Sequence, residues 1–181
     1  MKVILFLFVC TVSLLVNPSE EIAYGYVEDH KDLAVIEMYR TGIPASITLA
    51  QGMHESALGK SDLAIHANNH FGIKCKSYWQ GKTYAHKDDD YDEDGNLIKS
   101  CFRAYDTVID SYIDHSNFLT MTEHYQPCFQ FDKTDYINWA YTLKRCGYAT
   151  DKSYAIKLID KIEKYQLYVY DNYANPLEIR D

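Results

Sequence analysis

The segment from Ala45 to Leu58 constrains the fold most, because it is a largely apolar stretch with the pattern of a helix that offers solvent little polar surface. Pro44 stands where the first turn of a helix tolerates proline, and Gly59 is a residue type that commonly ends a helix. A helix that is apolar on most sides has to be covered by other elements. The sequence therefore predicts a buried helix with other elements packed around it.

The rest of the chain supplies those elements as helices around one short β-rich region. From Phe71 to Phe102, strand-prone residues flank an acidic stretch that ends in Asp94-Gly95, which predicts a small β-hairpin lobe. With 181 residues the chain is long enough for one domain with a substantial core. We therefore expect an α+β, mainly helical fold. The other helices are expected at residues 29–39, 61–66, 106 or 107 to 121, 134 or 135 to 145, and 150 or 151 to 165.

The first 23 residues have the pattern of a signal peptide. Met1-Lys2 is a short basic start, and Val3–Val16 is an almost unbroken apolar run, shorter than the roughly 20 residues of a membrane span. We expect a signal peptide at 1–23, a domain at 24–181, and a secreted or periplasmic protein with no stable membrane insertion after cleavage. An uncleaved N-terminal anchor is the alternative, because the region near Ala23 lacks a clean small-x-small pattern.

Four cysteines remain if the leader is removed, namely Cys75, Cys101, Cys128 and Cys146. An even number of cysteines in an exported protein suggests disulfides, and four cysteines allow three connectivities. Their positions favour Cys75 with Cys101, which flank the expected hairpin, and Cys128 with Cys146. Four small buried side chains or free thiols are the alternative.

The charge balance excludes some classes of partner. A formal net charge of −8 argues against nucleic acid and against anionic membrane surfaces, because both favour basic patches. Seventeen tyrosines suit stacking on sugars, although packing accounts for most of them.

Two partial metal motifs are incomplete, and we expect neither a metal nor a cofactor. His54-Glu55 begins like a zinc-protease helix motif, but Leu58 occupies the position of the second histidine. The stretch from Asp90 to Gly95 begins like a calcium loop, but Cys101 stands where the bidentate glutamate belongs. An acidic hairpin tip is the preferred interpretation, with a weak calcium site as the alternative.

Glu55 is the first candidate for chemistry, because it lies near the end of the apolar helix. A carboxyl group in such a place is partly desolvated, and desolvation raises its pKa. A glutamic acid that stays neutral near working pH can protonate the leaving oxygen of a glycosidic bond. From the pattern alone, an exposed structural glutamate is an equal alternative.

Four short motifs follow one another between about residues 44 and 168. They are Ala50-Gln51-Gly52-Met53-His54-Glu55-Ser56-Ala57-Leu58-Gly59-Lys60-Ser61, Asn69-His70-Phe71-Gly72-Ile73-Lys74, Phe102-Arg103-Ala104-Tyr105-Asp106 and Gly147-Tyr148-Ala149-Thr150-Asp151-Lys152-Ser153-Tyr154-Ala155. In this order they resemble the motifs of the bacterial endo-β-N-acetylglucosaminidase family, glycoside hydrolase family 73, which includes flagellar rod-cap hydrolase domains and autolysins. Four ordered motifs are far more specific than any one of them.

The resemblance implies a lysozyme-like fold and a peptidoglycan hydrolase that cleaves the β-1,4 bond on the reducing side of N-acetylglucosamine. It implies that Glu55 is the catalytic acid and that Tyr154 lines the cleft and orients the substrate or intermediate. Its partner would be the glycan strand of peptidoglycan, and we expect a monomer. The substrate-contacting residues that it implies are Tyr148, Phe71, Gly72, Asn69 and Tyr105, with a packing role as an equal alternative for Tyr148.

Members of this family often place a second carboxylate in the β lobe, about a dozen residues before the Phe-Arg motif. Here that region contains Asp88, Asp89 and Asp90. Counting favours Asp89, with either neighbour possible after a shift of one residue. Such an aspartate would activate water or stabilise positive charge on the sugar, and a solvated hairpin edge is the alternative.

Two other functions fit the same motifs. A glycan-binding module would keep the fold without turnover, which the uncertain second carboxylate allows. A muramidase or lytic transglycosylase on the same scaffold would use one glutamate and release different products. The reducing end of the released fragments separates these functions.

Overall fold

The computed structural model describes residues 17–178, apart from the side chain of Asp89. Residues 1–16, which hold most of the expected leader, lie outside this range. The described elements are α1 (Pro18–Thr41), α2 (Ala45–Glu55), α3 (Asp62–Ala67), β1 (Thr83–Tyr91), β2 (Leu97–Arg103), α4 (Val108–Met121), the 3₁₀ helix η1 (Glu123–Gln130), α5 (Tyr136–Arg145), α6 (Tyr154–Lys164) and the 3₁₀ helix η2 (Leu167–Asn172). The α+β expectation is confirmed.

Helix α1 begins eleven residues earlier than the sequence pattern predicted. The Asn17 side chain accepts a hydrogen bond from the Ser19 backbone N–H, and Pro18 occupies the first turn, where its missing N–H costs nothing. The expected boundary at residue 23 falls inside this helix, where Ala23 is fully buried. The polar residues after the apolar run therefore start a helix of the domain. None of the helices within residues 17–178 is long and apolar enough to cross a membrane.

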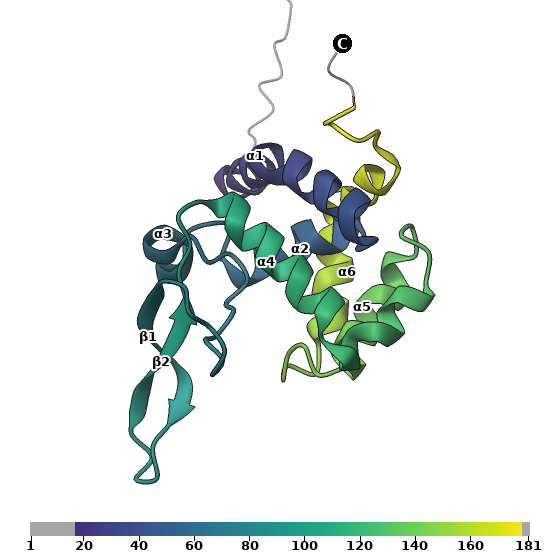
Figure 1. The fold of residues 1–181 in the computed structure, drawn as a ribbon. Coiled ribbons are helices and arrows are strands. Elements are labelled where there is room, and N and C mark those ends of the chain that lie inside the picture. The colour runs from purple at the N-terminus through teal and green to yellow at the C-terminus, as the bar shows by residue number, and fades with distance from the viewer. Residues whose placement is uncertain (1–16, 179–181) are drawn as a thin grey trace, which may run out of the picture.

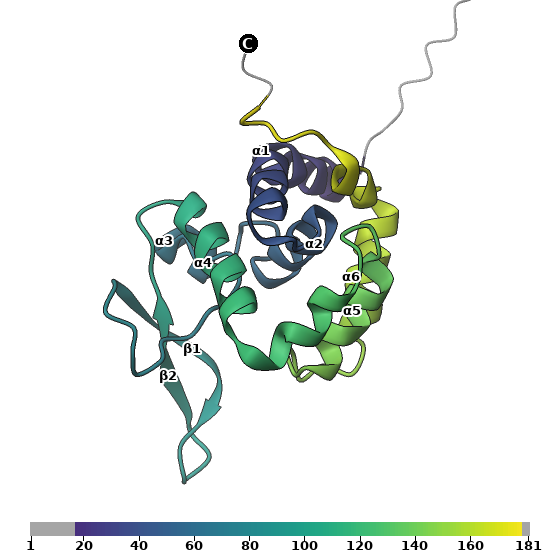
Figure 2. The same ribbon diagram turned by 45° about the vertical axis from the view of Figure 1, so that its right-hand side comes forward.

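Helix α2 is the buried centre of the helical part, as the sequence predicted. It contacts α1, α5, α6 and η2, and it lies among the other helices in both ribbon views (Figures 1 and 2). Nine of its eleven residues are buried, from Ala45 to Met53. The helix ends at Glu55 rather than at Leu58, because Ala57 and Leu58 adopt the left-handed conformation, with φ of 50° and 60°. The catalytic candidate therefore stands in the last turn of the central helix.

The start of α2 is capped by a residue far along the chain. The backbone N–H and the hydroxyl of Ser46 donate hydrogen bonds of 2.8 and 2.7 Å to the carboxylate of Asp171 in η2. Burial raises the pKa of Asp171 to about 6. The C-terminal segment is thereby tied to the first turn of the central helix, where a helix has unpaired N–H groups.

A buried hydrogen-bonded pair of tyrosines leaves room only for glycine in the middle of α2. The Tyr26 hydroxyl lies 3.1 Å from that of Tyr112 and 2.9 Å from Nδ1 of His70. A Cβ atom at Gly52 would lie 2.6 Å from the Tyr26 oxygen and 3.0 Å from the Tyr112 oxygen. Gly52 thus allows α1 and α4 to approach the central helix closely.

The β lobe is an antiparallel hairpin that extends away from the helices (Figure 1). Thr83 pairs with Arg103, and the register is regular to Lys87, after which an irregularity leads to the tip. The expected turn at Asp94-Gly95 is confirmed, with Gly95 at a φ of 80°. The segment 71–82 contains no strand, and its one isolated β-bridge joins Lys74 to Phe102.

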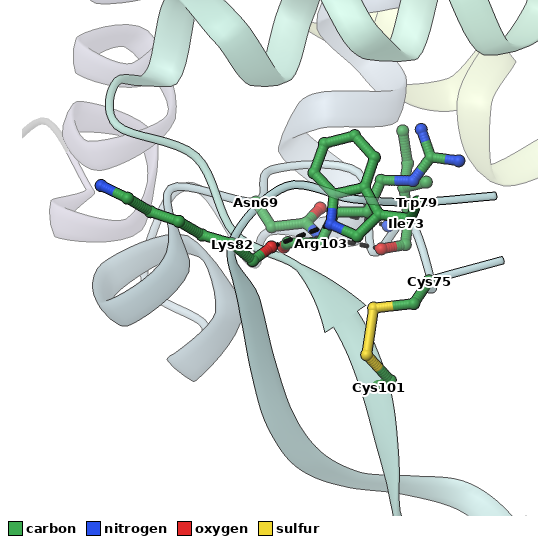
Figure 3. The surroundings of a disulfide bond; sticks show 7 residues. All are labelled: Asn69, Ile73, Cys75, Trp79, Lys82, Cys101 and Arg103. Carbon is green, nitrogen blue, oxygen red and sulfur yellow. Dashed lines mark hydrogen bonds between the residues drawn. A yellow bond between two sulfur atoms is a disulfide. The ribbon is translucent and has the colours of Figure 1, made fainter. Parts of the chain in front are cut away.

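One of the two expected disulfides is present. Cys75 and Cys101 join the loop before the hairpin to β2 (Figure 3), and the Cys75 N–H donates to the Cys101 carbonyl at 2.8 Å. The expected pairing of Cys128 with Cys146 is wrong, because both are free. Burial and the neighbouring Cys146 thiol raise the pKa of Cys128 to about 12, so the two cysteines lie beside each other as thiols.

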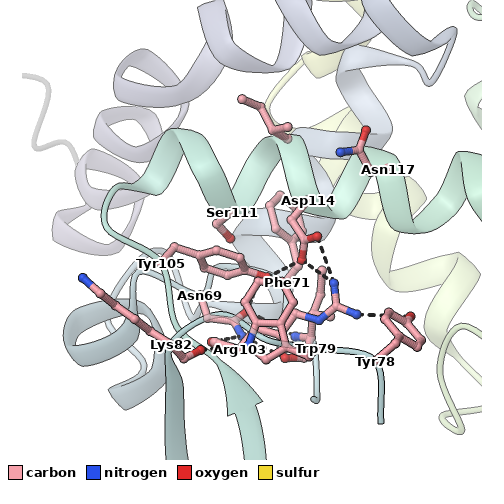
Figure 4. A network of polar contacts seen from close by, with 12 residues as sticks. Asn69, Phe71, Tyr78, Trp79, Lys82, Arg103, Tyr105, Ser111, Asp114 and Asn117 are labelled. Atoms are coloured by element: carbon pink, nitrogen blue, oxygen red, sulfur yellow. Dashed lines mark hydrogen bonds and ion pairs between the residues drawn. The ribbon is translucent and has the colours of Figure 1, made fainter. Parts of the chain in front are cut away.

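A polar network joins the base of the hairpin to α4 (Figure 4). The Arg103 guanidinium donates two hydrogen bonds of 2.8 and 2.9 Å to Asp114, and the Tyr105 hydroxyl donates one of 2.6 Å to the same carboxylate. The guanidinium also lies over the ring of Trp79, 4.6 Å from its centroid. This network fixes the orientation of the β lobe relative to the helical body.

Helix caps elsewhere follow the sequence closely. Ser61 caps α3, and Thr107 forms a capping box with Asp110 at the start of α4. Helix α6 begins at Tyr154, three or four residues later than expected, because residues 150–153 form a turn. Neither 3₁₀ helix was expected, since short 3₁₀ turns lack a marked apolar period.

We expect Gly52→Ala to destabilise the fold by about 1–3 kcal/mol, because the added methyl group overpacks the core against the Tyr26 hydroxyl. Tyr26→Phe removes that oxygen and should recover part of the loss in the double variant. Urea denaturation of the four proteins in this cycle measures the coupling. Gly25→Ala is the matched control, because nothing lies within 4 Å of its added Cβ. Additive effects of Gly52→Ala and Tyr26→Phe would contradict the steric explanation.

Candidate active site

Glu55 is one end of a hydrogen-bonded chain that joins two helices and has Tyr154 at its centre. The Tyr154 hydroxyl donates to Oε1 of Glu55 at 3.0 Å, and the same hydroxyl accepts a hydrogen bond of 3.0 Å from Nε2 of Gln51. Gln51 lies one turn before Glu55 on α2, so both side chains lie on one face of the helix. Tyr154 is the first residue of α6 and is buried, so it contacts Glu55 from the helical core and is not among the residues that line the cleft, contrary to the expectation from the sequence. The chain fixes the position of one carboxylate oxygen.

The surroundings of Glu55 favour its neutral form. Burial raises the pKa of the carboxyl group, and this effect exceeds the lowering caused by the hydrogen bond from Tyr154 and by the nearby charge of Lys161. Glu55 is only half-buried, so solvent or a ligand reaches it. A carboxylic acid that is both accessible and biased towards protonation can act as a proton donor.

Aromatic rings pack behind Glu55. Tyr148 stacks on Tyr154 with ring centroids 5.6 Å apart and an interplanar angle of 25°. The edge of Tyr148 meets His115, which in turn stacks on Phe71 with centroids 3.9 Å apart. Burial keeps His115 neutral, because it lowers the pKa to about 3. The two motifs that contain Phe71 and Tyr148 are thus joined through one buried histidine.

A cleft of about 430 Å³ lies between the helical body and the hairpin. Glu55, Phe71, Gly72 and Tyr148 line it, as the sequence analysis expected for a binding site. Gly72 has a φ of 62° and open space around its Cβ position, so the backbone conformation rather than close approach requires glycine there. The other lining residues are Leu63, Ile73, Lys74, Lys76, Asp88, Phe102, Phe118, Tyr125, Ala149 and Thr150.

Asn69 lies behind the cleft rather than in it. Its side-chain amide donates to the carbonyls of Ile73 and Arg103 at 3.0 and 2.8 Å, and its oxygen accepts from the N–H groups of Phe71 and Ile73. These four hydrogen bonds hold the turn that carries Phe71 and Gly72. Asn69 thus shapes the cleft through the backbone.

Tyr105 also lies outside the lining of the cleft. Its hydroxyl donates to Asp114, and its ring meets the edge of Trp79 with centroids 6.0 Å apart (Figure 4). Its contacts are those of the network that orients the hairpin, so the structure does not bring it together with Glu55.

The acidic segment of β1 reaches the cleft at Asp88. The ammonium group of Lys74 lies 3.2 Å from Asp88 and 2.6 Å from Asp90, and Asp90 also accepts a hydrogen bond from Ser100. These contacts lower the pKa of Asp90. The side chain of Asp89, the expected second carboxylate, lies outside the described part of the structure. Asp88 is thus a carboxylate of this segment that lines the cleft.

Two residues of the site were not singled out from the sequence. Gln51 lies four residues before Glu55 on a predicted helix, so helical spacing alone places it beside the carboxylate. Lys74 belongs to the quoted Phe-Gly-Ile-Lys motif, but its approach to Asp88 depends on how the loop folds against the hairpin. Within residues 17–178, no group of three or more His, Cys, Asp or Glu side chains is arranged to hold a metal ion.

Comparison with known proteins identifies one family. The sequence profile of the Glucosaminidase family, described as mannosyl-glycoprotein endo-beta-N-acetylglucosaminidase, matches residues 31–167. Exo-glucosaminidase LytG of Bacillus subtilis (strain 168) is 35% identical over 137 residues, which cover 72% of this chain and 47% of LytG. Peptidoglycan hydrolase FlgJ of Pseudomonas aeruginosa is 31% identical over 135 residues, which cover 71% of this chain and 33% of FlgJ. The chain therefore spans about half or less of the length of these relatives.

Solved structures share the fold. The catalytic domain of the autolysin Auto from Listeria monocytogenes superposes with a TM-score of 0.74 at 25% identity, covering 87% of this chain and 91% of that domain. A mutant peptidoglycan hydrolase from Sphingomonas sp. A1 superposes with a TM-score of 0.68 at 28% identity, covering 81% of this chain and 96% of that one. These similarities confirm the expected fold class.

We expect Glu55→Gln to stabilise the fold at pH 8 more than at pH 4. The pKa of Glu55 is higher in the folded state than in the unfolded state, where it is about 4.3. Ionisation of Glu55 therefore opposes folding once the pH exceeds that unfolded value, and each pKa unit of difference between the two states lowers the free energy of unfolding by about 1.4 kcal/mol. At pH 4 most of this penalty is absent from the wild type. Thermal denaturation at both pH values measures the difference, and an equal change in Tm at both would contradict the desolvated carboxyl.

Tyr154→Phe should raise the pKa of Glu55 further, because the hydroxyl donates to the carboxylate and so favours the charged form. Carbon-13 NMR titration of the glutamate side chains measures this pKa directly. Tyr141→Phe serves as the control, since Tyr141 is exposed on α5. An unchanged or lowered pKa in Tyr154→Phe would show that the hydroxyl does not stabilise the carboxylate.

Proposed function

The chain belongs to the glucosaminidase family, and from this premise we propose that it is a peptidoglycan hydrolase that cleaves the β-1,4 glycosidic bond on the reducing side of N-acetylglucosamine. The observation that carries the proposal is the half-buried Glu55, held by Tyr154 at the edge of a cleft and biased towards its protonated form. The name of the relative FlgJ, a peptidoglycan hydrolase, supports peptidoglycan as the substrate.

Glu55 acts as the general acid in this proposal. A protonated Glu55 donates its proton to the glycosidic oxygen as the bond to the sugar breaks, and the carboxylate that results keeps its hydrogen bond from Tyr154. Tyr154 therefore both positions the acid and stabilises its conjugate base. Gln51 holds the Tyr154 hydroxyl from the other side.

The second carboxylate comes from the segment 88–90 in this proposal. Both Asp88 and Asp90 contact Lys74, but Asp88 is favoured because its side chain lines the cleft, whereas Asp90 does not line it and also accepts a hydrogen bond from Ser100. Asp89, the residue favoured by counting along the sequence, is tested in the same assay as Asp88. Such a carboxylate activates a water molecule or stabilises positive charge on the sugar, and the N-acetyl group of the substrate offers an internal nucleophile as the alternative.

The substrate strand lies along the cleft. Phe71, Gly72 and Tyr148 line it and contact the sugar strand, with Tyr148 offering more of its ring than Phe71, which is only 4% exposed. Asn69 and Tyr105 act indirectly, through the turn at Phe71 and through the orientation of the hairpin. This division assigns substrate contact to three of the five residues expected from the sequence.

Wild-type protein should release fragments with N-acetylglucosamine at the reducing end from purified peptidoglycan, and Glu55→Gln should lower the rate at least about 100-fold. Mass spectrometry of the borohydride-reduced products identifies the sugar at the new reducing end. Asp88→Asn, Asp89→Asn and Asp90→Asn in the same assay identify the second carboxylate by the largest loss.

Each other product pattern selects a different function. Glycan binding without cleavage by the wild type would identify a binding module, anhydro ends would identify a lytic transglycosylase, and N-acetylmuramic acid ends would identify a muramidase. The family description says endo, whereas LytG is named an exo-enzyme. The length of the products distinguishes internal cleavage from removal of terminal sugars.

We also propose that the protein acts outside the cytoplasm. The apolar leader and the Cys75–Cys101 disulfide support export, since disulfides persist in oxidising compartments. Because α1 begins at Pro18 and buries Ala23, the proposed cut lies before α1 rather than at residue 23. N-terminal sequencing of the protein from the medium or periplasm tests both points. Full-length protein confined to the cytoplasm would contradict export.

A further inference from the structure

A second hollow, of about 270 Å³, lies between the end of α2 and α6. It shares no lining residue with the cleft that contains Glu55. One part of its wall is apolar, and the other part carries three lysines and one aspartate. We call it the lysine pocket; its lining residues are Met53, Leu58, Lys157, Asp160, Lys161, Lys164 and Tyr165.

The charge of the lysine pocket contrasts with that of the chain, whose formal net charge is −8. Lys157 is paired with Asp151 at 2.6 Å, and Lys164 with Glu20 at 3.2 Å. The side chain of Lys161, between them on α6, forms no ion pair or hydrogen bond within residues 17–178, and only the more distant charges of Asp160 and Glu55 favour its ammonium form. The pocket therefore presents one ammonium group that no direct ion pair neutralises.

Lys161 is held in an unfavourable environment. It is half-buried, and burial together with the nearby charge of Lys157 lowers its pKa. An anion in the pocket would relieve both effects, and a charge-assisted hydrogen bond in partly desolvated surroundings is stronger than one in water. The pocket is thus suited to a negatively charged group.

The apolar wall is built by a strained turn. Ala57 and Leu58 have φ of 50° and 60°, and non-glycine residues adopt this conformation only when the surroundings fix it. Two backbone hydrogen bonds fix it here, from Leu58 N–H to the Met53 carbonyl and from Ser61 N–H to the Ser56 carbonyl. As a result the Leu58 side chain lines the pocket beside Met53.

The lysine pocket lies close to the catalytic acid. Lys161 and Glu55 each shift the pKa of the other through their charges. Lys161 stands two turns, about 10 Å, along α6 from Tyr154, which hydrogen-bonds Glu55. The lysine pocket therefore lies near the end of the cleft that Glu55 lines.

Resting on the proposed function, we propose that the lysine pocket binds a stem peptide of the peptidoglycan strand that occupies the cleft. Stem peptides branch from the glycan and carry free carboxylates next to small alanine side chains. A carboxylate pairs with the ammonium group of Lys161, and the methyl groups contact Met53, Leu58 and Tyr165. The enzyme thereby distinguishes strands that bear peptides from bare glycan.

The test is isothermal titration of two soluble strands of equal length into the Glu55→Gln variant, which holds the strand without cutting it. One strand bears its stem peptides, and an amidase has removed them from the other. We expect the peptide-bearing strand to bind about tenfold more tightly, as one charge-assisted hydrogen bond provides. Lys161→Met in the same background should remove this advantage and leave binding of bare glycan unchanged.

Lys99→Met is the matched control, since it removes the same charge from an exposed position on β2. Equal affinity of the parent for both strands, or equal weakening of both by Lys161→Met, would overturn the stem-peptide proposal and leave the proposed function intact. Failure of the parent to bind bare glycan while it binds peptide-bearing strands would contradict the proposed cleft and support the pocket. Failure to bind either strand would overturn both.

Discussion

The burial of α2 is the constraint on which the rest of the structure depends. Nine of its eleven residues are buried, so every helix that contacts it has to cover an apolar surface. The same burial desolvates the last turn and raises the pKa of Glu55 there. One feature of the sequence, an apolar helix that ends in a glutamate, therefore produces both the hydrophobic core and a carboxyl group with a raised pKa.

Contacts from distant parts of the chain hold this helix at both ends and in the middle. Asp171 caps its first turn, the tyrosine pair of α1 and α4 closes over Gly52, and Tyr154 meets its last side chain. These contacts come from three different helices and from η2. The position of the Glu55 carboxyl group is thus a property of the whole helical body, which suits the proton transfer that we propose for it.

Local patterns predicted the elements well and their ends poorly. The apolar stretch, the Asp94-Gly95 turn and the cap at Ser61 are short-range signals, and each is confirmed. The left-handed turn at Leu58 and the late start of α6 depend on hydrogen bonds that no period reveals. The start of α1 was missed because its polar first turn follows an apolar leader in the sequence.

The site divides in the same way. The motif resemblance identified Glu55, Tyr154, Tyr148 and Phe71, which the fold brings together. Motif membership could not separate residues that line the cleft from residues that support it, such as Asn69 and Tyr105, because both kinds stand close to the same turns.

The carboxylates of Glu55 and of segment 88–90 lie in contrasting surroundings. Glu55 ends the enclosed helix α2, whereas most of β1 and β2 beyond the first pairs of the hairpin is exposed (Figure 1). Insertions and substitutions accumulate in such projecting segments at little cost to the core. In the proposed reaction the carboxylate of segment 88–90 therefore stands where a substitution costs the fold little, whereas Glu55 stands at the end of an enclosed helix.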